Sequence, residues 1–183
     1  MSQVKRVSTA LPILSAFTLY ITAPFAHKGI EEGLSKMETA VYGSSERKQN
    51  TNVGFVFAGL VVLSLILIFI LSLFLGNNGV NDIVLMVLTG VQAIGVSGTL
   101  LWCYISAGKQ QKRILRLANS LDVEVTYLKG FPQFGCAFIG TWLFWIILGM
   151  FIITLVLSYG PCVRQYRTVK MYNELVEEFN HQR

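Results

Sequence analysis

Charged residues are scarce in this sequence. Asp, Glu, Lys and Arg together make up 14% of its 183 residues, whereas a soluble domain carries roughly 25%. Hydrophobic residues make up 53%, and many of them stand in long uninterrupted runs. These features exclude an ordinary soluble domain and indicate that lipid is the main solvent of the chain.

Cysteine is also scarce. The three cysteines, Cys103, Cys136 and Cys162, are an odd number and include no C-x-x-C pair, which argues against a disulfide framework. The simplest interpretation is three small apolar thiols, although Cys103 and Cys136 could approach each other across an intervening loop. Cys162 follows an apolar run closely, so it is a candidate for palmitoylation.

Residues that carry chemistry are few and scattered. His27 and His181 are the only histidines, and no metal-ligand spacing is present. No nucleophile elbow and no glycine-rich phosphate loop occurs. We therefore predict no metal, no cofactor and no enzymatic activity. The alternative is a lipid-active enzyme whose catalytic residues lie unrecognised in the loops.

Four apolar segments are each close to the 20 residues that a helix needs to cross a membrane. Because the runs are continuous rather than alternating, they favour helices over strands. The first contains Pro12 and Pro24 and is the weakest of the four, and it also resembles a signal peptide with a poor cleavage site. The expected spans are residues 8–26, 53–76, 83–106 and 136–159.

The fold class predicted from these runs is all-α, a single membrane domain over residues 1–183. It would be a four-transmembrane-helix bundle with short interfacial amphipathic helices. The short polar connection at residues 77–82 makes the second and third spans antiparallel neighbours.

Small residues inside the spans predict close helix packing. The third span is the richest in them, so we expect it to be the most enclosed. No charged residue and no histidine lies well inside a span, which excludes a buried ionic transport site, and we expect Gln92 to bond to another helix. The predicted packing residues are Gly54, Ala58, Gly90, Ala93, Gly95, Ser97, Gly98 and Gly140.

Three polar segments contain apolar residues at helical spacing. In the first loop these are Ile30, Leu34, Met37 and Val41, and in the tail, residues 162–183, they are Tyr172, Leu175, Val176 and Phe179. Each predicts a short amphipathic helix, and Gly160-Pro161 should end or kink the fourth span before the tail. The tail helix would dock on the bundle, lie on the membrane or bind a partner.

The third loop predicts an amphipathic helix over residues 108–121. It combines the basic residues Lys109, Lys112, Arg113 and Arg116 with the apolar residues Ile114, Leu117, Ala118 and Leu121. Such a helix can lie on anionic lipid headgroups, or it can pack over the end of the bundle with its cations solvated. The net charge of +5 is dispersed beside apolar spans, so lipid is a better partner than nucleic acid.

Four spans would place both termini on one side of the membrane and the first and third loops on the other. Six basic residues then accompany the termini and nine accompany the loops, so the positive-inside rule favours cytoplasmic loops. Small four-span proteins more often have cytoplasmic termini, and we adopt that orientation against the raw count.

A family resemblance begins at the third span. Gly135, Phe138 and Trp142 open the fourth span after a loop of about thirty residues, and this arrangement resembles the claudin superfamily, including its fungal PalI-type members. The resemblance implies a left-handed four-helix bundle with cytoplasmic termini, acting in junctions, membrane domains or channel complexes. The resemblance covers about a third of the chain, and the first loop departs from the family pattern because it carries no Trp and no Cys.

The predicted function is that of a non-enzymatic, multi-pass protein of the plasma membrane or an endomembrane. It would pack against a larger membrane protein or against itself, as an accessory subunit or an organiser of membrane domains. Trp142, Trp145 and the basic residues of the third loop are the predicted partner and membrane contacts. The alternative is an oligomeric channel or transport subunit lined by Thr89, Gln92, Ser97 and Thr99.

Overall fold

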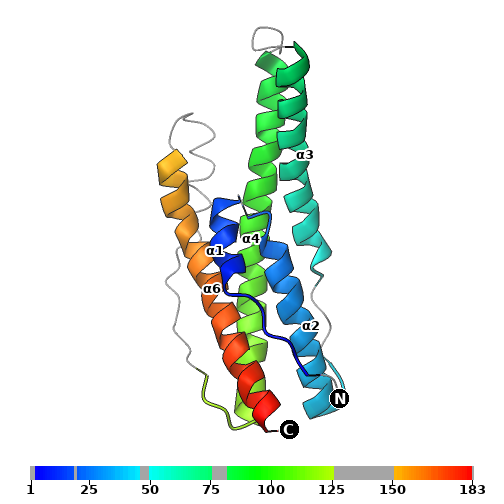
Figure 1. Ribbon diagram of the computed structural model, residues 1–183, viewed down its shortest axis with the longest axis vertical. Coiled ribbons are helices and arrows are strands. Elements are labelled where there is room, and N and C mark those ends of the chain that lie inside the picture. Colours follow the sequence, from blue (N-terminus) through cyan, green and yellow to red (C-terminus); the bar gives the residue numbers. More distant parts are fainter. Residues whose placement is uncertain (1–2, 19, 46–49, 76–81, 126–150, 183) are drawn as a thin grey trace.

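The computed structural model describes residues 3–18, 20–45, 50–75, 82–125 and 151–182 of the protein, and all the regular secondary structure in this part is helical. This confirms the all-α class. Figure 1 shows the helices and their labels. They are α1 (Ala10–Phe17), α2 (Ala23–Tyr42), α3 (Asn52–Leu75), α4 (Asp82–Ser120) and α6 (Phe151–His181).

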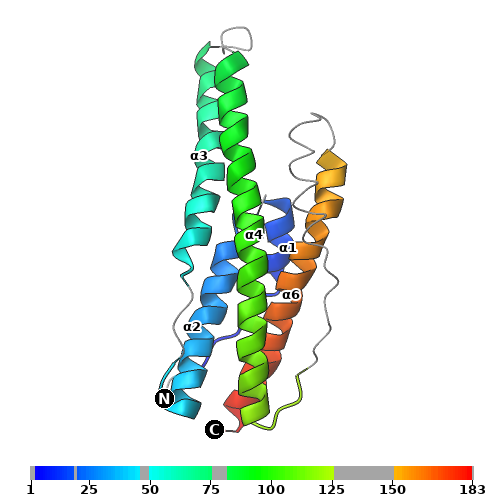
Figure 2. The same ribbon diagram turned by 180° about the vertical axis from the view of Figure 1, so that it is seen from behind.

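The longest helix, α4, is the axis of the molecule. Its 39 residues extend about 58 Å at 1.5 Å per residue, nearly twice the hydrocarbon thickness of a bilayer. α3 runs antiparallel along its first half, and α2 and α6 lie along its second half (Figures 1 and 2). We call residues 52–75 and 82–106 the hairpin, and residues 3–42, 107–125 and 163–182 the base.

The second and third predicted spans correspond to α3 and to the first part of α4. Both helices are long and apolar enough to cross a membrane. The interfacial helix predicted at residues 108–121 is not a separate element, because α4 continues through it to Ser120. Residues 136–150 of the fourth predicted span lie outside the described residues.

The sequence predicts that Gly160-Pro161 ends or kinks the fourth span; the helix end is wrong, and the kink stays a prediction. α6 runs from Phe151 to His181 without interruption, so the last part of the fourth predicted span and the amphipathic tail form one helix. A proline inside a helix costs about 3 kcal/mol, and the burial of Val169, Tyr172 and Leu175 of α6 in the core of the base acts against this cost.

The prediction of one continuous helix over residues 8–26 is also wrong. α1 ends at Phe17, Tyr20 takes a left-handed conformation with φ 64°, and α2 then runs back towards the end where the chain began (Figure 1). Pro24 lies in the first turn of α2, where its missing N–H costs nothing. Inside a continuous helix the same proline would break a hydrogen bond.

This reversal changes the arrangement of loops and termini. The Tyr42 hydroxyl donates to Ser120 over 2.9 Å, and the Gln182 side chain donates to the Leu121 carbonyl over 3.4 Å. The end of α2, the end of α4 and the C-terminus therefore lie together, and the N-terminal residue Val4 contacts Asn180 at the same end. The expectation that the first and third loops lie opposite the termini is wrong.

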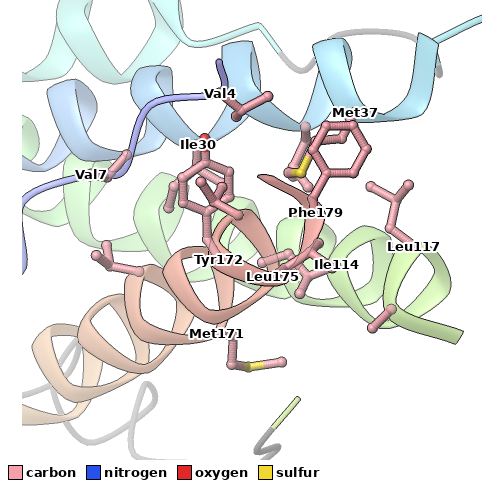
Figure 3. Packing of buried hydrophobic residues seen from close by; sticks show 14 of the residues in the cluster. Val4, Val7, Ile30, Met37, Ile114, Leu117, Met171, Tyr172, Leu175 and Phe179 are labelled. Carbon is pink, nitrogen blue, oxygen red and sulfur yellow. The ribbon is translucent and has the colours of Figure 1, made fainter. Parts of the chain in front are cut away.

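The three predicted amphipathic stripes meet in one core (Figure 3). It forms where α2, the second half of α4 and α6 pack together, and its most enclosed members include Ile30, Leu34, Met37, Ile114, Leu117, Tyr172 and Leu175. Of the two interpretations of residues 108–121, the structure shows the packed one. The apolar stripes pack against each other, so each is buried by protein rather than by lipid.

Candidate functional site

Small residues let α3 and α4 approach closely in the hairpin. A Cβ atom built on Gly54 would lie 2.5 Å from the Trp102 ring, and one on Gly95 would lie 2.8 Å from Val61. A Cβ on Gly98 would overlap the Phe57 ring. These three glycines therefore pack helices, as predicted.

The other predicted packing residues have different surroundings. Ala58, Ala93 and Ser97 are buried, whereas a Cβ on Gly90 would meet no described atom within 4 Å. Packing at Gly90 therefore stays a prediction. Gly140, Trp142 and Trp145 lie outside the described residues, as does the side chain of Cys162.

The polar residues of the third predicted span do not form an open lining in the described part of the chain. Gln92 and Thr99 are buried, and the Thr99 hydroxyl donates to the Gly95 carbonyl of its own helix over 2.8 Å. The Ser97 hydroxyl is buried and has no hydrogen-bond partner among the described residues.

The basic residues of the third loop divide into two kinds. Lys109, Lys112 and Arg116 are exposed on the surface of α4. Arg113 is buried, with 7% of its side chain exposed, and it points into the interface with α2. The predicted membrane or partner contact through Arg113 is therefore wrong, because its guanidinium group is occupied inside the base.

Arg113 is held by two carboxylates of α2. Its Nε and one terminal nitrogen donate to the two oxygens of Glu38, each over 2.7 Å, and its other terminal nitrogen donates to Glu31. Such fork-to-fork pairing is the strongest geometry for a carboxylate. Burial alone would lower the pKa of Arg113, but the hydrogen bonds and charges of Glu38 and Glu31 raise it, so the cation persists at all physiological pH values.

The ion pairs continue into a chain of hydrogen bonds around His27. Gln110 donates from Nε2 to the His27 carbonyl over 3.0 Å and to Glu31 over 3.5 Å. Its Oε1 atom must then accept from His27 Nδ1, 2.8 Å away, and this assigns the proton to Nδ1. His27 Nε2 is left to accept from the Cys103 thiol at 3.1 Å. We call His27, Glu31, Glu38, Cys103, Gln110 and Arg113 the polar ladder.

Cys103, His27 and Gln110 are ordered like a nucleophile, its base and the group that orients the base. Neither Cys103 nor His27 has any exposed surface, and the Trp102 ring packs against the imidazole with centroids 5.1 Å apart. A substrate would have to enter this packed interface to reach the sulfur. The geometry is that of a structural network joining α2 to α4.

Removal of the Arg113 charge should destabilise the protein. Arg113→Met leaves two carboxylates buried without their cation, and breaking a buried pair in this way costs about 3–5 kcal/mol. Lys112→Met is the matched control, since the neighbouring side chain is exposed and should cost less than about 0.5 kcal/mol. Denaturant unfolding in detergent, followed by circular dichroism, measures both, and equal effects of the two variants would contradict the ladder.

The folded structure should become less stable at acidic pH because of His27. Burial lowers the pKa of His27 from 6.5 to about 4, although Gln110 and Glu31 act in the opposite direction. The unfolded chain therefore binds a proton that the folded chain does not bind between pH 6.5 and about 4, so stability is lost as the pH falls through this window. From neutral pH to pH 5 the expected loss from His27 is about 2 kcal/mol.

The pH effect can be assigned with two histidine variants. His27→Gln should flatten the dependence of stability on pH in this window, while His181→Gln, at an exposed position, should leave it unchanged. Unfolding midpoints at several pH values provide the comparison. A slope that persists in His27→Gln would show that another group is responsible.

Comparison with known proteins adds no family to this geometry. No family model, curated protein or solved structure matches the chain. Gly135, Phe138 and Trp142, which suggested the claudin resemblance, lie outside the described residues. That resemblance stays a prediction.

Proposed function

We propose that this chain is a multi-pass integral membrane protein that acts without catalysis, by packing its helices against a larger membrane protein or a second copy. The observation that carries this proposal is the apolar surface of the hairpin. Large side chains cover it, and Val56, Phe69, Leu73, Phe74 and Met86 are each 63% exposed or more. Monomeric soluble proteins rarely expose apolar patches of this extent.

The low burial of α3 distinguishes it from a core helix of a soluble protein. Only 17% of the most apolar stretch of α3 is buried within the chain. A core helix of a soluble protein would be largely covered by its neighbours. Such a surface is suited to contact with lipid or with another transmembrane helix.

The distribution of charged residues supports a bilayer around the hairpin. All basic residues among the described part of the chain lie in the base, and Asp82 is the one charged residue in the hairpin. With the bilayer around the hairpin, the described basic residues of the loops and of the termini all lie on one side. The positive-inside rule then makes the base cytoplasmic, and the conflict between six and nine basic residues disappears.

Aromatic and basic residues mark the expected membrane boundary. The Arg164 guanidinium lies 3.8 Å from the centre of the Tyr104 ring, and Trp102 lies two residues earlier in α4. Such residues are typical of the headgroup level. Lys109 is close to this level, whereas Arg116 lies about 18 Å further along α4, so Lys109 and Arg164 are the better candidates for contact with anionic headgroups.

An oligomeric channel has less support. Three of its four expected lining residues, Gln92, Ser97 and Thr99, are buried within the chain, and the fourth, Thr89, is half-buried. Most of the exposed residues of the hairpin are large and apolar and would make a poor conducting surface. Association through helix packing uses the surface that is present.

The membrane topology can be tested by cysteine labelling. In a background with Cys136→Ser and Cys162→Ser, we expect an impermeant maleimide to label Asn78→Cys on intact cells. Ser44→Cys, beyond the end of α2, should react only after permeabilisation. The four-span arrangement with cytoplasmic termini predicts the reverse pattern for both positions, so a reversed result would overturn the proposed topology.

Association can be tested by purification in mild detergent. We expect the chain to purify with a membrane protein or as an oligomer, and Phe69→Ala with Leu73→Ala should reduce that association, because these side chains are among the most exposed of the hairpin. Lys36→Ala, on the exposed surface of the base, is the control. A strictly monomeric protein without partners would count against this function.

A further inference from the structure

The N-terminal segment, residues 3–8, has no regular secondary structure and lies between α2 and α6 (Figure 3). Val4 and Val7 are buried in the core, at 5% and 8% exposure. The residues between and beside them are exposed. The segment is therefore attached to the helices in the manner of a bound peptide.

Two asparagines of α6 hold the main chain of the segment. Asn173 accepts from the Val7 N–H over 2.9 Å and donates to the Val7 carbonyl over 2.8 Å. Asn180 makes the same pair of bonds with Val4, over 3.4 and 3.1 Å. One side-chain amide thus satisfies both main-chain groups of a residue, as a neighbouring strand would.

The spacing of the two asparagines matches the segment. Seven residues of α-helix rise about 10.5 Å, and three residues of extended chain cover about 10 Å at roughly 3.3 Å each. Val4 and Val7 are both buried against the helices, so they lie on one face of the segment. The groove therefore recognises an extended backbone with a small apolar residue at every third position.

The opposite wall of the groove is shaped by glycine. A Cβ on Gly29 would lie 3.0 Å from the Val7 side chain, and one on Gly33 would overlap the Tyr172 hydroxyl. That hydroxyl donates to the Lys5 carbonyl over 2.9 Å. Five polar contacts thus reach the main chain of the segment, and its side chains contribute specificity at only two positions.

Charge adds a preference for basic peptides. Arg6 pairs with Glu177 over 2.9 Å, with both side chains at least half exposed, so this pair contributes little stability. Glu178 is a further acidic residue of the same helix, whereas Glu174 lies 4.0 Å from Lys170; Lys5 in the segment is also basic.

We propose that the groove between α2 and α6 is a binding site for an extended, basic peptide segment of a partner protein, with small β-branched residues three positions apart. The N-terminal segment is its resident ligand, and a partner segment binds by displacing it. A tethered ligand has an effective concentration on the order of millimolar, so a partner competes against it. This inference does not depend on the proposed membrane function.

The test uses a fluorescent peptide with the sequence of residues 1–10 and the full-length chain. Val4→Asp with Val7→Asp removes the apolar anchors of the resident segment, and we expect this variant to bind the peptide roughly tenfold more tightly than the unaltered chain. Adding Asn173→Ala and Asn180→Ala to that variant should abolish binding. A peptide carrying both aspartates is the matched control and should not bind.

A second measurement needs no variant. Hydrogen exchange at the amides of Val4 and Val7 should accelerate when unlabelled peptide is added in excess to the unaltered chain, because the resident segment is released. Equal affinity of the peptide for the unaltered chain and the aspartate variant, or exchange that does not respond, would overturn the proposal. If the peptide did not bind and cross-linking instead joined two copies through their N-terminal segments, the proposal would be overturned, because the segment would then be exchanged between copies of the chain.

Discussion

The pairing of Arg113 with Glu31 and Glu38 is the constraint on which the rest of the structure depends. A buried cation without partners is very costly, and the Coulombic gain of a buried pair offsets its desolvation only when the geometry is good. Here both oxygens of Glu38 are used, and Gln110 satisfies Glu31 from the side. A slip of α2 by one turn, about 5.4 Å, would separate these groups, so the pair sets the register of α2 on α4.

That register determines where the rest of the base can form. With α2 fixed on α4, its apolar face presents Ile30, Leu34 and Met37 to the stripe of α6, and its glycines form one wall of the groove for the N-terminal segment. The hydrogen bond between Tyr42 and Ser120 then closes the end of the base. The polar ladder therefore contributes specificity of position, while the apolar core contributes most of the stability.

The parts predicted from the sequence are those set by local pattern. Continuous apolar runs predicted α3 and the first half of α4 within one or two residues, and the spacing of small residues indicated the contacts of Gly54, Gly95 and Gly98. The reversal at Tyr20 was missed because a proline early in an apolar run can either kink a helix or begin a new one. Hydrophobicity does not distinguish between these two conformations, since both keep the apolar residues away from water.

The core of the base and the polar ladder were missed for a different reason. An apolar stripe on a helix has the same pattern whether lipid or another helix covers it, so the sequence could not show that the three stripes cover each other, and it left residues 108–121 and the tail open between membrane and protein contacts. Arg113 and Lys112 are neighbours of the same charge type in the sequence, and only the packing partner distinguishes them. A usable signal was the recurrence of His27, Glu31 and Glu38 on the face of α2 that also carries Leu34, because buried charges on an apolar face require partners.

The contacts of the base also order its assembly. α3 and α4 are joined by a short connection and can pair as soon as both are made. Arg113 is separated from Glu31 by 82 residues, and Val4 from Asn180 by 176, so these contacts require the second half of α4 and the end of α6 to be present. The groove between α2 and α6 consequently becomes complete only when the end of the chain is present, and its first available ligand is the start of the same chain. The effective concentration of that tethered segment fills the groove before a partner meets it, which makes displacement, rather than simple capture, the physical step that a partner must achieve.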